Sequence, residues 1–147
     1  MTKNKIYYAH PLDTYGLPEE DKDVEFLEKK GIIVNPSDIE LDCSNKMIVY
    51  IYIIKDCDTV YYRGTTAGVA FEVLCALAFG KPVFSLETGR EITPDQIREL
   101  VLSFNSKTFT KKNLELFKKH FPSYYDKLIE IIDSSSSATR MEKYKRI

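Results

Sequence analysis

The sequence predicts an α/β fold in which a parallel sheet is flanked by helices. Short β-branched and aromatic segments alternate with segments of helix length, and one segment, residues 69–79, is almost entirely apolar over the length of a buried helix. The chain has 147 residues, enough for a single domain with its own core.

The first unit is a strand, a helix and a second strand. Residues 5–9 form the first expected strand, which ends before Pro11 because proline cannot donate to a strand ladder. Residues 19–30 are charged with a few apolar positions and close at Gly31, as in an amphipathic surface helix with a glycine C-cap. Residues 32–34 form the second strand, so the pair is parallel with a right-handed crossover.

Residues 47–54 are ambiguous, because their β-branched and aromatic residues favour a strand. Residues 59–62 are a strong third strand, and a parallel arrangement requires a crossover of a dozen or more residues before them. We therefore expect a helix over about residues 44–55, with Ser44 as its N-cap. The alternative is a hairpin that turns at residues 56–58.

The following segment is the one around which the chain is organised. Residues 63–68 form a glycine-bearing loop, residues 69–79 are apolar except for Glu72, and Gly80 ends the helix before a fourth strand at residues 82–86. A helix that is apolar all round is buried on more than one side, against a sheet and a neighbouring helix or subunit. A homodimer that buries this helix is therefore expected.

Glu72 is unusual in such surroundings, because glutamate is rarely buried without a compensating partner. We place it in the first helical turn, where the helix dipole favours the carboxylate and the apolar neighbours disfavour it. Opposed effects of this kind occur at catalytic acids, and the structural alternative is a helix cap.

A helical extension follows from about residue 93. Its three expected helices cover residues 94–104, 110–121 and 122–132. Residues 1–133 would form the single α/β domain, and residues 134–147 a flexible basic tail or short helix.

The composition excludes several classes of partner. A net charge of −1 gives no general attraction to nucleic acid polymers. The longest apolar run is too short to span a membrane and the N-terminus lacks a signal-peptide core, so a cytoplasmic protein is expected. Cys43, Cys57 and Cys75 are remote from each other and from both histidines, which predicts neither a disulfide framework nor a zinc site. We expect no metal and no organic cofactor.

Ligands of parallel α/β sheets bind beyond the carboxyl ends of the strands, where the strand order reverses. This rule brings together the loops at residues 7–13, 35–38 and 63–68, with Glu72 just behind the last of them.

Two stretches carry a family resemblance: TAGVAFEV at residues 66–73, which leads to GKPV at residues 80–83, and IYYAHPL at residues 6–12. In these stretches, and in Asp58 ahead of the third strand, the chain resembles the nucleoside 2-deoxyribosyltransferase-like family, which includes nucleoside 5′-monophosphate N-glycosidases. The resemblance implies a flavodoxin-like or Rossmann-like sheet of about four to five strands. It also implies an enzyme that cleaves or transfers at the N-glycosidic bond of a nucleoside or nucleotide.

The resemblance assigns roles to individual residues. Glu72 would be the nucleophile that attacks the anomeric carbon and forms a covalent ribosyl–enzyme, and Tyr7 would hold Glu72 in place, although a strand tyrosine more often packs in the core. Thr66 lies where the transferases carry an aspartate for the sugar 5′-hydroxyl and the monophosphate hydrolases a serine for phosphate, so its neutral hydroxyl favours a phosphorylated ligand. Gly68 permits close approach of the backbone beside a helix N-terminus.

The chain also departs from the family pattern. The aspartate that assists the leaving group would fall near Tyr50, and Pro11 and Asp13 occupy the places of the serine and arginine that grip phosphate. This departure favours the alternative of a non-catalytic nucleotide-binding or sensing module.

Three further residues complete the expected site. His10 and Arg63 are the candidates to replace the missing positive charge, and Asp58 is a candidate substrate ligand whose more common role is to orient the turn into its strand.

Overall fold

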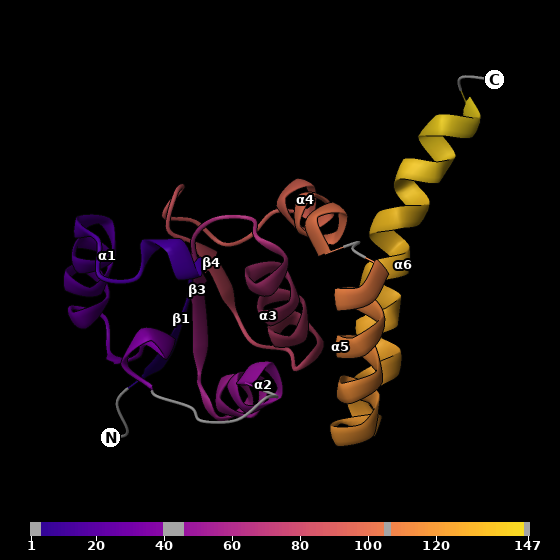
Figure 1. Cartoon of the computed structure of the whole chain (residues 1–147). Helices are drawn as coiled ribbons and strands as arrows, with labels where there is room; N and C mark the ends of the chain where they lie inside the picture. Colours follow the sequence, from indigo (N-terminus) through magenta and orange to yellow (C-terminus); the bar gives the residue numbers. More distant parts are fainter. Residues whose placement is uncertain (1–3, 40–45, 105–106, 146–147) are drawn as a thin grey trace.

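A four-stranded parallel sheet forms the centre of the protein (Figure 1). The structure is a computed structural model that describes residues 4–39, 46–104 and 107–145. The strands are β1 (Lys5–Ala9), β2 (Ile32–Val34), β3 (Thr59–Tyr62) and β4 (Val83–Ser85), in the spatial order β2-β1-β3-β4. Both neighbours of β1 run parallel to it, with Tyr7 opposite Val34 on one side and Val60 on the other. The predicted α/β, flavodoxin-like fold is confirmed.

Helices cover both faces of this sheet (Figure 1). Helix α1 (Pro18–Glu28) lies on one face, whereas α2 (Lys46–Asp56) and α3 (Ala67–Ala78) lie on the other. Helices α4 (Pro94–Phe104), α5 (Lys107–His120) and α6 (Pro122–Lys145) pack outside α2 and α3. Two short 3₁₀ turns, Leu12–Thr14 and Pro36–Asp38, follow β1 and β2.

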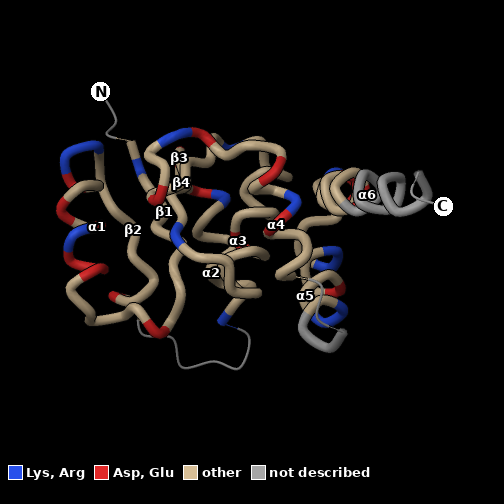
Figure 2. Tube along the Cα trace, turned by 90° about the horizontal axis from the view of Figure 1, so that it is seen from above, with Lys and Arg blue, Asp and Glu red and all other residues tan. Residues whose placement is uncertain are grey.

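The alternation of side chains along β1 produces two separate apolar clusters. Ile6 and Tyr8 point to the α1 face and pack with Leu27, while Tyr7 and Ala9 belong to the larger core beneath α2 and α3. Charged residues are frequent along α1 and scarce along α2 and α3, in agreement with one solvated and two enclosed helices (Figure 2).

Helix α2 confirms that topology outweighs β propensity in this segment. Ile48, Ile51 and Ile54 recur at helical spacing and are buried against the core, and the helix provides the crossover from β2 to β3. The expected N-cap, Ser44, lies outside the described residues.

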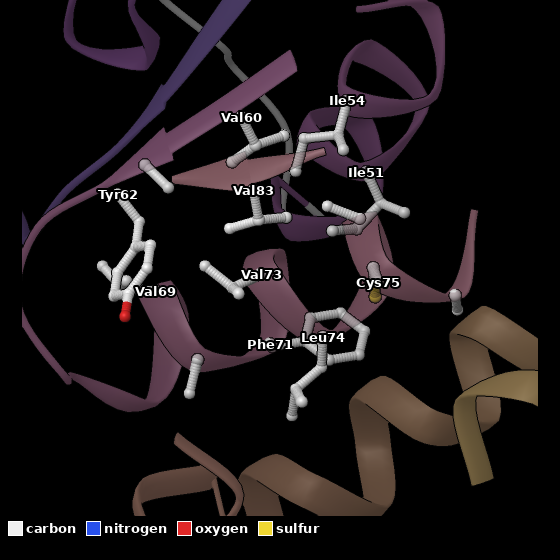
Figure 3. Packing of buried hydrophobic residues seen from close by; sticks show 14 of the residues in the cluster. Ile51, Ile54, Val60, Tyr62, Val69, Phe71, Val73, Leu74, Cys75 and Val83 are labelled. Carbon is white, nitrogen blue, oxygen red and sulfur yellow. The ribbon is translucent and has the colours of Figure 1, made fainter. Parts of the chain in front are cut away.

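Nine of the twelve residues of helix α3 are buried within this same chain. It contacts the sheet, α2, α4 and α6, and Figure 3 shows its side chains Val69, Val73 and Leu74 among those of the core. Phe71 stacks on Phe104 at 5.2 Å between ring centroids. Burial of such a ring contributes roughly 2 to 3 kcal/mol. The helical extension thus covers the apolar helix, so the burial of α3 no longer requires a homodimer.

Several boundaries differ from expectation. Helix α3 begins at Ala67 with Thr66 as its N-cap, so Glu72 lies in the second turn and is not a cap. Gly31 is not a left-handed C-cap, because α1 ends at Glu28 with Lys29 as its C-cap. Gly31 is needed for another reason, since an added Cβ would lie 2.2 Å from the backbone oxygen of Asn4.

The C-terminal helices also extend beyond their expected limits. Helix α5 begins at Lys107 instead of residue 110, and α6 continues without a break through the serine run at residues 134–137 to Lys145. The expected change to a tail at residue 134 therefore does not coincide with a helix end. Over the described ranges, no helix combines the length and the apolar character needed to cross a bilayer.

Candidate active site

The three loops expected to meet do line one cavity. It has a volume of about 430 Å³ and lies where the loops after β1, β2 and β3 approach the N-terminus of α3, between strands whose connections leave on opposite faces of the sheet. Its described lining residues are His10, Pro11, Leu12, Asp13, Tyr15, Pro36, Met47, Tyr50, Thr66, Gly68, Val69 and Glu72. Four predicted site residues, His10, Thr66, Gly68 and Glu72, are thus brought together.

Glu72 is a buried acid at the wall of this cavity, with 6 % of its surface exposed. The Tyr7 hydroxyl, from the centre of the sheet, donates a hydrogen bond to its Oε2. The predicted contact between these two residues is therefore present, and Tyr7 is both a core residue and the partner of the acid.

Burial raises the pKa of Glu72 to about 8, although the hydrogen bond from Tyr7 lowers it in part. The second-turn position explains why the helix end does not offset this effect, which is confined to the first turn. The pKa of Tyr7 is raised in turn by its burial and by the charge of Glu72. The ionised form of Glu72, the one able to act as a nucleophile, therefore increases as the pH rises through about 8.

Thr66 and Gly68 shape the mouth of the cavity at the start of α3. The Thr66 Oγ1 accepts from the Val69 N–H at 3.4 Å and caps the helix. A Cβ added to Gly68 would meet only the Met47 Cε within 4 Å, at the ordinary contact distance of 3.5 Å. The fold itself therefore tolerates a side chain at Gly68, and what the glycine provides is open space in the cavity.

His10 forms part of the wall, but its ring nitrogens are already engaged. Its Nε2 lies 2.7 Å from Glu20 Oε2 and its Nδ1 lies 3.1 Å from the Tyr8 carbonyl oxygen, which accepts only a proton-bearing nitrogen. The ring also stacks on Tyr8 at 3.7 Å and faces Tyr15 at 4.7 Å.

The partner of His10 is an ionised carboxylate. Burial raises the pKa of Glu20, but hydrogen bonds from His10, the Gly16 N–H and Ser37 outweigh burial and lower it below its ordinary value. Both nitrogens of His10 therefore face acceptors, and the Glu20 carboxylate lies 2.7 Å from the ring within the wall.

The other two predicted binding residues lie outside the cavity. Arg63 follows β3 on the same face as Tyr61, so it turns toward α1, where its Nε and Nη2 bind the two oxygens of Asp23 at 2.7 and 2.9 Å. Asp58 precedes β3, and its Oδ2 accepts from the Lys5 N–H at 2.9 Å, at the amino edge of the sheet. Their placement supports structural roles for both residues.

Asp13 and Tyr15 are lining residues whose role the sequence did not assign. Within the described lining, Asp13 and Glu72 are the acids, and neither lysine nor arginine is present. The charge of this lining therefore does not favour phosphate, contrary to what the hydroxyl of Thr66 suggested. Tyr15 lies two residues beyond the expected loop, which ended at Asp13, and only the 3₁₀ turn after β1 brings it back to the cavity.

The described residues contain no group of three or more His, Cys, Asp or Glu side chains placed to hold a metal ion. Compared with protein-family models, with curated proteins and with solved structures, the chain has no match.

Proposed function

We propose that the protein cleaves or transfers at the N-glycosidic bond of a nucleoside or nucleotide. The observation that carries this proposal is the Tyr7–Glu72 pair, a buried acid held by a phenol at the wall of a cavity of about 430 Å³. A volume of this size lies within the usual range of small-molecule sites, and a perturbed acid in a cavity is a candidate for catalysis.

Glu72 acts as the nucleophile of a retaining reaction in this proposal. Its carboxylate attacks the anomeric carbon as the bond to the base breaks, and the bonding electron pair leaves with the base. Water or a second base then attacks the same carbon and regenerates Glu72. Tyr7 orients the carboxylate and, by hydrogen bonding to its ionised form, moderates the rise of its pKa.

The test is to incubate the protein with nucleosides, deoxynucleosides and their monophosphates, with and without an acceptor base, and to follow free base by chromatography. Glu72→Gln is the inactive variant, and Glu115→Gln on the exposed surface of α5 is the matched control. Release or exchange of base that disappears only in Glu72→Gln supports the proposal. Activity that survives Glu72→Gln contradicts it.

A non-catalytic nucleotide-binding or sensing module is the second candidate. It is favoured by Tyr50 at the wall where the resemblance calls for an acid. A ligand that raises the melting temperature without release of base would support it. The homodimer and the cytoplasmic location stay predictions, and light scattering tests the first.

A further inference from the structure

Building on the glycosidic function proposed above, we propose that the substrate is a nucleoside whose base carries a positive charge, an N-ribosyl pyridinium or a comparable cationic heterocycle. Three properties of the same cavity support this substrate class: the sign of its charges, its aromatic rings and the kind of leaving group that its residues are able to serve.

The acidic side chains of the described lining are Asp13, which lies exposed at the rim, and Glu72, which lies buried at the wall and gains its charge as the pH rises through about 8. His10 adds no net positive charge to the cavity, because its Nε2 lies 2.7 Å from the ionised Glu20 carboxylate. The N-terminus of α3 adds a partial positive charge of about one half, less than the full charge of the Asp13 carboxylate. A cationic ligand is therefore attracted, and the 5′-phosphate of a nucleotide is disfavoured.

Aromatic side chains stand beside these acids. Tyr15 and Tyr50 come from different parts of the chain, the loop after β1 and helix α2, and both line the cavity. The faces of such rings attract a flat cation, with a gain of about 0.5 to 2 kcal/mol in general. Carboxylates combined with tyrosine rings form a surface that favours a cationic heterocycle over a neutral one.

The leaving group provides the chemical argument. A neutral base departs as an anion unless an acid protonates it, whereas a cationic base departs as a neutral molecule. When Glu72 attacks the anomeric carbon, the electron pair of the C–N bond returns to the ring nitrogen and cancels its charge. Water then attacks the same carbon, Glu72 leaves as the carboxylate, and the proton of the water passes to solvent. This reaction needs no acid to protonate the departing base, so it is compatible with Tyr50 at the place where the resemblance calls for an acid.

A cationic base also activates the nucleophile. The ionisable groups that face Glu72 are Tyr7 on β1, Tyr15 after the 3₁₀ turn and Cys75 on α3, with Tyr50 of α2 close to Tyr7. None of these groups supplies a positive charge. A cation in the cavity therefore favours the ionised form of Glu72, so its binding is accompanied by loss of a proton near neutral pH.

The experiment compares four probes: nicotinamide riboside (a pyridinium nucleoside), its 5′-monophosphate, inosine and uridine. Initial rates are divided by the rate of each probe without enzyme, because a pyridinium is a better leaving group in water as well. The proteins are the natural chain, Glu72→Gln, Asp13→Asn and Asp126→Asn, an exposed matched control on α6. Melting temperatures establish that each variant is folded, and isothermal titration measures binding.

We expect corrected kcat/KM for nicotinamide riboside to exceed that for inosine and for the monophosphate by about tenfold or more. Asp13→Asn should reduce its advantage over both by about fivefold, whereas Asp126→Asn should not change it. Turnover of neutral nucleosides at equal corrected rates would overturn the substrate class and leave the glycosidic function standing. Tight binding of nicotinamide riboside without any turnover would support the cation preference and refute the glycosidic function. Neither binding nor turnover of any probe would refute both.

Discussion

Replacement of Glu72 by glutamine should stabilise the protein at alkaline pH and change its stability little at acidic pH. In the folded protein burial raises the pKa of Glu72 from its ordinary value of 4.5 to about 8. At pH values between these two pKa values, Glu72 has lost its proton in the unfolded chain but retains it in the folded chain. The free energy of unfolding therefore falls as the pH rises through this range and is level above about pH 8. Since one pKa unit corresponds to about 1.4 kcal/mol, the ionisation of Glu72 alone lowers the free energy of unfolding by about 5 kcal/mol.

Urea unfolding of both proteins at pH 5, 7 and 9 measures this effect. The difference between the two free energies of unfolding isolates Glu72 from the other titrating groups, and the glutamine oxygen still accepts from Tyr7. We expect the difference to move by about 4 to 5 kcal/mol in favour of the variant between pH 5 and pH 9. A difference that stays constant within about 1 kcal/mol would refute the reasoning that burial keeps Glu72 protonated. Glu115→Gln should show such a constant difference because its side chain is exposed.

Three further substitutions test the site and its surroundings. Tyr7→Phe removes the hydrogen bond that lowers the pKa of Glu72, so the pH–rate profile should shift to higher pH; an unchanged midpoint would contradict this. Gly68→Ala should preserve or raise the melting temperature, since it favours the helix, while titration shows weaker ligand binding as its methyl group enters the cavity. Arg63→Met removes the bidentate partner of the buried Asp23 carboxylate and should destabilise the fold by about 3 kcal/mol in urea unfolding. The kcat/KM of the Arg63→Met variant should not change, and a large loss would indicate that Arg63 takes part in substrate binding.

The order of elements could be predicted from the sequence because topology and local pattern agree for most of them. Where they conflict, over α2, the need for a crossover between parallel strands identified the helix that the β-branched residues concealed. The place of the cavity followed from the same topology, since the rule on carboxyl edges selected the three loops that line it.

Side-chain direction is what the sequence left undetermined. Asp58 precedes its strand and so lies at the wrong edge of the sheet, a distinction that strict use of strand polarity would have made. Arg63 lies at the right edge but on the α1 face, and its buried partner, Asp23, is 40 positions away in the sequence. The pairing of His10 with Glu20 likewise depends on packing that no local pattern specifies.

The enclosure of α3 has a consequence for how its acid is held in place. Phe71 and Glu72 are neighbours on one helix, and the ring of Phe71 packs against Phe104 of α4 and Phe117 of α5 while the carboxylate faces the cavity. A substitution that repacks these rings also turns or shifts the helix that carries Glu72, because packed side chains leave little free volume. The C-terminal helices supply none of the described lining of the cavity, yet they pack against the helix that carries its carboxylate. We therefore expect substitutions at Phe104 or Phe117 to change the position of Glu72, although neither residue lines the cavity.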